Sequence, residues 1–388
     1  MADYGFMAGI RRELRRLGSR PAYLLGMFGI PLFVAFFFVT ILGEGLPQQI
    51  PTAIVDLDQS TMSRQVVRTI SASQLVSVRN DVESYDDALR LVREGEIYGF
   101  FVIPANFKRD ALSMRTPTLE YYTNMTYYIP GTLAFKGFKT VAVTTSGGVV
   151  KNTLIAVGLD PQQIDGLLQP VVIDINPLNN PWMNYSIYMA PSFTMATVVL
   201  MMMIITVFSI TGEIKHGTSW AWLRTCRGRL GIALLSKLLP QSAIWCSLVL
   251  FISWMFFGWQ HFPVNGSLWW MLLATFLLVF AVQGFTVFIV SVVPNPRMSF
   301  IVVALFGVLS YSFTGFSMPV PSMYGYIGVF SWLAPVRYWY LIFVDNALNG
   351  VPVYYSRWFF VALLGFCLLP LTLLPRLAKA LRHPVYVP

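Results

Sequence analysis

The sequence predicts an α-helical polytopic membrane protein with six transmembrane helices and an α/β extracytoplasmic domain inserted between the first and the second. Three observations lead to this fold class. Hydrophobic residues make up 56% of the 388-residue chain and charged residues only 12%, whereas soluble domains carry about 25% charged residues. Six stretches are apolar and long enough, at about 20 residues, to cross a bilayer. One long stretch between the first two has the composition of a soluble domain.

The six predicted spans contain no Asp, Glu, Lys or Arg. Each such charge at mid-membrane costs on the order of 2.5–3.5 kcal/mol on the insertion scale, so their absence fits helices that face lipid or one another. The spans are Pro21–Leu42, Ile187–Thr211, Leu238–Trp259, Leu268–Val293, Met298–Phe316 and Trp358–Pro375. The first is longer than the apolar core of a signal peptide, and no A-x-A cleavage site follows it. We therefore expect it to remain as an anchor.

Basic residues predict that both termini are cytoplasmic. The N-terminal segment, the loop after the second span, the short break at 294–297 and the C-terminal tail together hold fourteen basic and three acidic residues. By the positive-inside rule this side faces the cytoplasm. The predicted organisation is an interfacial helix at 1–20, a first span at 21–43, an outer domain at 44–185, spans two to six at 186–376 and a cytoplasmic tail at 377–388.

The N-terminal segment is predicted to form an amphipathic helix. At 100° per residue its apolar side chains share one face and its arginines share the other; these are Phe6, Ile10, Leu14 and Leu17 against Arg11, Arg12, Arg15 and Arg16. Such a helix lies in the cytoplasmic membrane interface, with its cations among anionic headgroups. An ordinary positively charged flank would explain the arginines but not their clean separation from the apolar residues.

The segment 44–185 alternates between strand and helix patterns, which is typical of an α/β domain. Ser84 is placed to cap one helix, with Asp87 three residues further on. Predicted strands cover 50–58, 75–79, 97–104, 118–124 and 171–177, and predicted helices cover 59–70, 84–96, 105–114 and 131–157.

Asp56 and Asp58 form a D-x-D pair at the end of the first predicted strand. Such a pair is able to hold a divalent cation in a membrane-anchored glycosyltransferase-like enzyme. The simpler interpretation is that Asp56 ends the strand while Asp58 or Ser60 caps the next helix. Acceptor side chains are common at such turns, and we favour this second interpretation.

Other catalytic and cofactor motifs are missing from the sequence. There is no Gly-Lys pair, which excludes a P-loop, and no G-x-S-x-G elbow. His216, His261 and His383 are scattered, and no His or Cys pair has metal-ligand spacing. We expect the chain to bind no cofactor and no metal, and its basic clusters to contact lipid headgroups and not nucleic acid.

Methionine and aromatic side chains within the spans are open to two interpretations. They either line a cavity for a hydrophobic substrate, as adaptable Met-rich surfaces do, or fill the interior of the helix bundle. The candidates for such a cavity are Met195, Met202, Phe208, Phe306 and Phe313.

The loop after the second span, GEIKHGTSWAWLRT, is longer than a turn needs and concentrates charge in a chain that otherwise avoids it. Gly217 is expected to end the helix of the second span, and Thr218 is a typical N-cap residue for the next helix. Trp220 and Leu223 then share one face of a short amphipathic helix at about 213–227. A plain positive-inside loop needs neither the cap nor two tryptophans. We therefore predict a docking element for a cytoplasmic partner.

The segment 315–349 is aromatic, nearly uncharged and broken by several Pro and Gly. Broken apolar backbone at membrane depth survives only where protein packs around it or where it lines a cavity. We predict short re-entrant helices on the outer side.

These features together resemble the permease subunit of exporter-type (ABC-2) ABC transporters. The matching motifs are Glu213-Ile214-Lys215-His216-Gly217-Thr218 after the second span, Gly315, Pro319, Met323 and Pro335 in the outer segment, and Asp56, Asp58, Ser60, Ser63 and Arg64 at the start of the first loop, with Gly95 through Pro104 further on. The last two groups are similar to the subgroup with a large periplasmic domain in the first external loop.

The resemblance implies an inner-membrane protein of bacteria that lacks catalytic residues of its own. Two permease halves, a second copy of this chain or a paralogue, would pair above two separate ATP-binding subunits, which carry ATP and Mg²⁺. Those subunits would dock on a coupling helix and on the N-terminal helices. Coupling would involve Glu213, Lys215, Gly217, Thr218, Trp220 and Leu223, with Glu213 joined to a neighbouring cation. The outer domain would guide the substrate or meet a periplasmic membrane-fusion adaptor.

Two other classes of function are weaker. The glycosyltransferase-like alternative depends on the Asp56 and Asp58 pair alone. A sensor or scaffold needs an output domain, and the residues after the last span show none.

Overall fold

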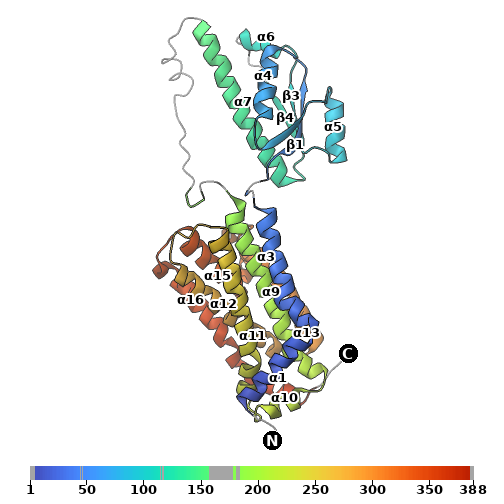
Figure 1. The fold of residues 1–388 in the computed structure, drawn as a ribbon. Coiled ribbons are helices and arrows are strands. Elements are labelled where there is room, and N and C mark those ends of the chain that lie inside the picture. The colour runs from blue at the N-terminus through green and yellow to red at the C-terminus, as the bar shows by residue number, and fades with distance from the viewer. Residues whose placement is uncertain are drawn as a thin grey trace. The chain divides into compact units, whose positions relative to one another are not determined.

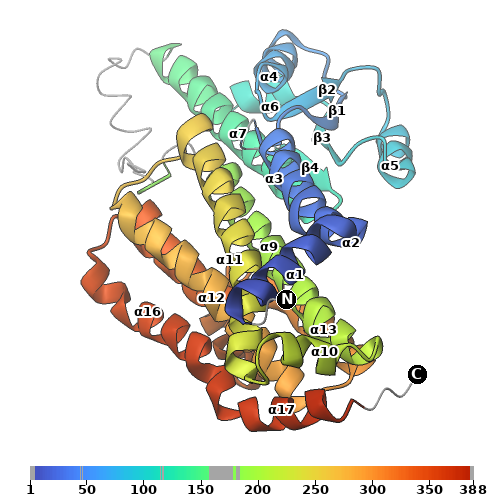
Figure 2. The same ribbon diagram turned by 60° about the horizontal axis from the view of Figure 1, so that its bottom comes forward.

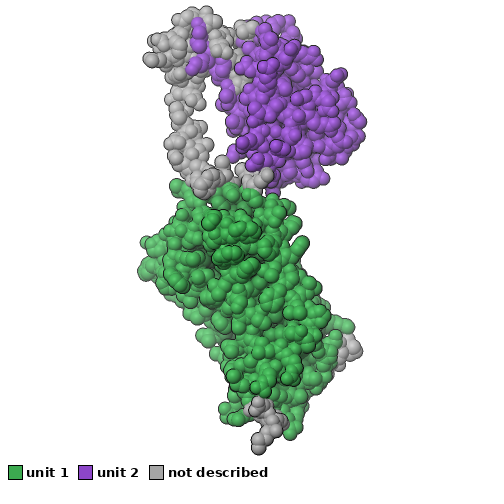
Figure 3. All heavy atoms as spheres, in the orientation of Figure 1, with its two compact units in different colours: residues 1–45, 177–388 green, residues 46–176 purple. Residues whose placement is uncertain are grey.

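The computed structural model describes residues 5–43, 45, 47–113, 115, 118–156, 178–180 and 184–384. The chain divides into two compact units, coloured separately in Figure 3: unit 1 combines residues 1–45 with 177–388, and unit 2 covers residues 46–176. The predicted strand at 171–177 lies outside the described residues.

Unit 1 is a bundle of helices whose arrangement is shown in Figures 1 and 2. Its α-helices are α1 (Phe6–Ser19), α2 (Pro21–Leu24), α3 (Ile30–Ile41), α9 (Tyr185–Lys215), α10 (Ser219–Thr225), α11 (Leu230–Ser253), α12 (Leu268–Val292), α13 (Pro296–Phe313), α14 (Gly325–Phe330), α15 (Pro335–Ile342), α16 (Val353–Leu368) and α17 (Leu374–Arg382). Short π-helical segments extend three of them, at Leu25–Gly29 before α3, Trp254–Trp259 after α11 and Phe343–Leu348 after α15. Turns of 3₁₀-helix lie at Val320–Ser322, Ser331–Leu333 and Leu369–Thr372.

Six helices among the described residues are long and apolar enough to cross a membrane, and they correspond to the six predicted spans. Their bounds are Pro21–Ile41, Tyr185–Lys215, Leu230–Trp259, Leu268–Val292, Pro296–Phe313 and Val353–Thr372. The third differs most from its prediction, since it begins at Leu230 and not at Leu238. Lys237, one residue before the predicted start of this span, is therefore inside a helix.

The segment predicted to be re-entrant forms two helical pieces, Gly325–Leu333 and Pro335–Leu348, which meet at 88°. Such a bend belongs either to one broken span or to a re-entrant loop. Pro335 explains the break, because its ring disfavours helical backbone in the residue before it, and Ala334 is extended at φ −91°, ψ 108°.

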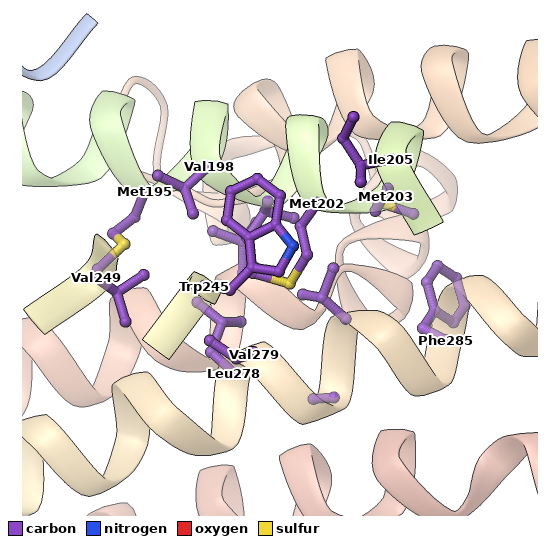
Figure 4. Packing of buried hydrophobic residues seen from close by; sticks show 14 of the residues in the cluster. Met195, Val198, Met202, Met203, Ile205, Trp245, Val249, Leu278, Val279 and Phe285 are labelled. Carbon is purple, nitrogen blue, oxygen red and sulfur yellow. The ribbon is translucent and has the colours of Figure 1, made fainter. Parts of the chain in front are cut away.

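The core of unit 1 lies between α9, α11 and α12. Figure 4 shows the indole of Trp245 beside the side chain of Met202, with Leu278 and Val279 of α12 nearby. α9 and α12 are the most enclosed of the six spans, whereas the span that contains α16 is mostly exposed. α9 therefore forms the central column of the bundle.

The described part of unit 2 is a four-stranded sheet with helices on both faces. Its elements are β1 (Ile50–Asp56), α4 (Thr61–Ser71), β2 (Val76–Arg79), α5 (Tyr85–Glu94), β3 (Gly99–Ile103), α6 (Phe107–Leu112), β4 (Glu120–Thr123) and α7 (Tyr128–Ala156). The strand order is β2-β1-β3-β4; β1 is parallel to both neighbours, with Ile50 opposite Val76 and Thr52 opposite Gly99, and β4 is antiparallel to β3.

The two faces of this sheet have separate cores. Ile54 and Phe101 pack against α4 and α7, while Val55 and Phe100 pack against α5. The predicted cap is confirmed, since the Ser84 hydroxyl accepts a hydrogen bond of 3.1 Å from the Asp87 amide. Where described, the predicted strands and helices are present, with shifts of a few residues at their ends.

Candidate functional site

α1 lies directly against α11 at the end of the bundle where α10 is found (Figure 2). Gly9 makes this contact possible. A Cβ atom at Gly9 would lie 2.3 Å from the Ser236 hydroxyl oxygen and 2.7 Å from its Cβ, and real Cβ atoms do not approach so closely. The buried face of α1 consists of Gly9, Glu13 and Leu17, at i, i+4 and i+8.

Glu213, in the last turn of α9, is fully buried and lies at the centre of an ionic cluster that α1 completes. Arg12 donates two hydrogen bonds to its two carboxylate oxygens, both at 2.8 Å. Arg16 and Lys237 donate to the same carboxylate, with the Lys237 Nζ at 2.9 Å. The bidentate geometry with Arg12 is the strongest that an arginine offers to a carboxylate.

Lys237 and Glu13 form the second half of the ionic cluster, and each side chain is only 1% exposed. The Lys237 Nζ lies 3.0 Å from Glu13 Oε2. Glu13 also accepts hydrogen bonds of 2.8 Å from the Ser209 hydroxyl and the Gln241 amide. We define the ionic cluster as Arg12, Glu13, Arg16, Glu213 and Lys237.

The cluster has three cations and two anions, and a backbone carbonyl of α9 is a further acceptor for two of the cations. The Ser209 carbonyl of α9 accepts hydrogen bonds from Lys237 at 3.2 Å and from Arg16 at 3.4 Å. Gly212 leaves room for this, because a Cβ there would lie 2.8 Å from Arg16 Nη2.

α10 is attached to the cluster by two side chains. The Thr218 hydroxyl donates to Glu213 Oε2, and its backbone amide donates to the Glu213 carbonyl at 2.9 Å. The ring of Trp222 lies 4.6 Å from Lys237 Nζ, a cation–π contact worth about 2 kcal/mol when desolvated. Gly217, at φ +65°, makes the turn between α9 and α10.

Two predictions about α10 were wrong. Thr218 occupies the N-cap position but makes no capping hydrogen bond; its backbone is not extended, at φ −96° and ψ 3°, and its hydroxyl donates to Glu213. Trp220 does not share a buried face with Leu223: Trp220 is 58% exposed, whereas Trp222 is 1% and Leu223 5% exposed. The buried anchor is therefore Trp222, at i−1 from Leu223.

The other face of α10 is open to solvent. Trp220 and Arg224 lie there together, with the guanidinium carbon 5.5 Å from the ring centroid. Lys215 is exposed just before the helix. α17 packs against α10 and α12, with Leu377 and Leu381 buried. α1, α10 and α17 thus gather at one end of unit 1, an arrangement that fits the expected common side for both termini.

α1 has three faces and not the two that were predicted. Arg12 and Arg16 turn inward to Glu213, so they do not extend among headgroups as expected. Partial burial lowers the pKa of Arg12, but the hydrogen bond to Glu213 and its charge raise the pKa above its ordinary value. Arg15 stays exposed, and the exposed apolar face carries Met7 and Leu14.

The candidate cavity residues are not gathered in one place. Met195 and Met202 are buried in the core of the bundle, as Figure 4 shows, which favours a packing role. The three aromatic residues pair with different partners: Phe208 with Tyr23, Phe306 with Phe285 and Phe313 with Phe330.

Asp56 is used as a structural acceptor in unit 2. Its carboxylate accepts from the amides of Asp58 and Gln59, at 3.1 and 3.0 Å, and from the Ser63 hydroxyl at 2.7 Å. Ser60 caps α4, as the simpler interpretation of the sequence required. Within the described ranges no three His, Cys, Asp or Glu side chains form a metal-binding group.

Sequence reasoning missed Glu13, Lys237, Ser209, Gln241 and Trp222. Two signals would have found the first two. Glu13 is the single acidic residue in an arginine-rich helix and lies at i+4 from Gly9 and i−4 from Leu17. Lys237 is a single charge within an apolar run, and an ionisable residue there marks a functional site unless shown otherwise.

Comparison with known proteins identifies the family of the chain. The profile of the ABC-2 family transporter proteins matches residues 21–374, which is most of the chain. A search of curated proteins found no match. The matched region includes all six candidate spans and the whole of α9, α10 and α11. The chain is a member of the ABC-2 transporter family, whose members form the membrane component of ABC transporters.

Proposed function

We propose that this chain is the transmembrane subunit of an ATP-driven exporter. It moves a hydrophobic or amphipathic substrate out of the cytoplasm or the inner leaflet, and separate ATP-binding subunits hold ATP and Mg²⁺. The uncharged, aromatic and Met-rich spans favour such a substrate. The glycosyltransferase-like alternative has no comparable support, because the Asp56 carboxylate is occupied within its own turn.

The observation that carries the proposal is the ionic cluster. It joins α1, α9 and α11 at one end of unit 1, and Thr218 and Trp222 attach α10 to it. Its two carboxylates and Lys237 are almost fully buried. A force applied to α10 therefore acts directly on α9, the central column, and on α11. Buried helices transmit such a shift because close-packed interiors have low compressibility.

In this proposal the exposed face of α10, with Trp220, Arg224 and the nearby Lys215, contacts the ATP-binding subunit. The cluster side lies in the cytoplasm, as the positive-inside rule requires. The exposed apolar and basic faces of α1 lie against membrane lipids in the inner membrane of a bacterium. Unit 2 is a periplasmic domain that guides the substrate or meets a membrane-fusion adaptor. A second copy or a paralogue completes the permease pair.

Substituting the exposed face of α10 tests the docking role without disturbing the cluster. The double variant Trp220→Ala/Arg224→Glu is expected to lose most of the co-purifying ATP-binding subunit from the same genome, because buried tryptophan and arginine anchors dominate protein interfaces. The measurement is the ratio of the two subunits after affinity purification from membranes.

A matched control changes the same residue types elsewhere. Trp269→Ala/Arg357→Glu alters an exposed tryptophan at the start of α12 and an arginine on α16. It should keep the partner at the wild-type ratio. Full retention of the partner by the α10 variant, at normal membrane levels, would rule out docking through this face.

A further inference from the structure

Arg337 is a half-buried cation at the end of the bundle where α15 begins and α13 ends. This end is opposite the ionic cluster, since the cluster lies at the C-terminal end of α9 and Phe316, beside Gly315, packs on Phe193 near the N-terminal end of α9. The Arg337 guanidinium lies against the turn after α13: a Cβ at Gly315, where φ is +100°, would be 3.5 Å from Nη1.

This guanidinium has no anionic partner among the residues that the structure describes. Asp345, the nearest acidic residue in the sequence, accepts a hydrogen bond of 2.8 Å from Ser356 instead. Two other half-buried arginines of unit 1, Arg12 and Arg16, both donate to Glu213. An uncompensated charge in a partly desolvated site is costly, so Arg337 is placed to receive an anion from outside the chain.

The surroundings of Arg337 are apolar. Val320 lies close both to Gly315, which Arg337 faces, and to Gly328 of α14. A Cβ atom at Gly315 would lie 3.5 Å from the Val320 side chain, and one at Gly328 would lie 3.6 Å from it. Beyond Val320, α14 and the following turn present large exposed apolar side chains, listed here: Tyr324, Ile327, Val329, Phe330, Trp332 and Leu333. A cation thus stands beside a surface suited to an acyl or other hydrophobic tail.

We propose that Arg337 binds the anionic headgroup of an amphiphile, a phosphate ester or a carboxylate, whose tail lies on α14. The planar guanidinium matches both headgroups by two parallel hydrogen bonds. The ligand is either a resident membrane lipid or a transported molecule of the same chemistry. The site stands independently of docking through α10, so loss of one leaves the other intact.

Equilibrium binding to the purified full chain in a non-ionic detergent tests the site. The probes are dodecyl phosphate and dodecyl phosphocholine, which share one tail and differ in net charge, with bound molecules counted by native mass spectrometry. Wild-type protein is expected to prefer dodecyl phosphate. Arg337→Gln should lose about tenfold in affinity for it, as expected for a charge-assisted hydrogen bond, and little for the zwitterion.

Two further variants make the result specific. Arg337→Lys keeps the positive charge but cannot form the two parallel hydrogen bonds of a guanidinium. It should retain part of the preference for dodecyl phosphate over dodecyl phosphocholine. Arg357→Gln removes an arginine that lies over the Tyr354 ring at 3.7 Å and should bind like wild type. Equal binding by Arg337→Gln and wild type would overturn the proposal, as would an equal loss in Arg357→Gln. If Arg337→Gln does not fold, a lysine variant that binds dodecyl phosphate as tightly and as selectively as wild type overturns the proposal instead.

Nanodiscs distinguish the two sources of the ligand. A resident lipid would compete, so dodecyl phosphate should bind more weakly in phosphatidylglycerol than in phosphatidylcholine discs. A transported molecule would bind equally in both. Each result supports the anion site, provided that Arg337→Gln weakens the binding of dodecyl phosphate in phosphatidylcholine discs. Equal binding by wild type and Arg337→Gln in those discs contradicts the proposal.

Discussion

Glu213→Ala is expected to destabilise unit 1 by about 3–5 kcal/mol, the usual cost of removing one partner from a buried ion pair. The substitution leaves Arg12, Arg16 and Lys237 with Glu13 as the remaining carboxylate of the cluster. In a thermal-stability assay of the purified protein, the midpoint should fall by roughly 10 °C. The measurement is monodisperse protein remaining after heating, followed by size-exclusion chromatography.

Glu96→Ala provides the matched control. Glu96 also accepts from an arginine, Arg79, at 2.6 Å, but both side chains are about half exposed. Exposed pairs contribute only about 0–1 kcal/mol, so the midpoint should hardly move. Equal shifts for Glu213→Ala and Glu96→Ala would show that the cluster is not a buried ionic structure.

Gly9→Ala is expected to displace α1 from α11 and to cost about 1–3 kcal/mol, as overpacking of a tight contact does. The new Cβ would lie 2.7 Å from the Cβ of Ser236, an atom that no side-chain rotation moves away. Since α1 carries Arg12, Glu13 and Arg16, its displacement also pulls three members of the cluster apart. The thermal midpoint of the purified protein measures this loss.

Gly18→Ala is the control on the same helix. Nothing lies within 4 Å of the position that its Cβ would occupy, and alanine favours helix over glycine by about 1 kcal/mol. The control should therefore raise the midpoint slightly while Gly9→Ala lowers it. Adding Ser236→Gly to Gly9→Ala should restore part of the loss. Two alanine variants that behave alike would mean that α1 does not pack closely on α11.

Much of the fold follows from composition and periodicity. Charge-free apolar runs locate the six spans, because a bilayer sets their length and excludes ions. The 2- and 3.6-residue patterns of unit 2 locate its strands and helices in the same way. These signals are local, so a single sequence is enough to read them.

The site was predicted only in part, because it depends on contacts between distant residues. The loop after α9 identified Glu213 and Thr218, and a cation near Glu213 was expected. Which cations bind it was not readable: Arg12 is 201 residues away in the sequence. Periodicity placed Trp220 and Leu223 on one face, but α10 is so short that either tryptophan fits an apolar face, and only packing under Lys237 selects Trp222.

Lys237 shows why a charge rule misplaces some residues. The absence of charge defined the third span, so Lys237 ended it and was counted with the loop. In the structure the helix continues to Leu230, because Glu13 and Glu213 from two other helices neutralise the ammonium group. A buried charge is acceptable when paired, and the pairing is a tertiary property.

Site-specific photo-crosslinking tests most directly whether α10 contacts an ATP-binding subunit. A photo-reactive phenylalanine derivative replaces Trp220 in one variant and Trp269, exposed at the start of α12, in the other. In membranes that contain both subunits, irradiation should join the ATP-binding subunit to position 220 and not to position 269. An adduct at 269 alone, or none at 220 while the two subunits still co-purify, would contradict docking through α10.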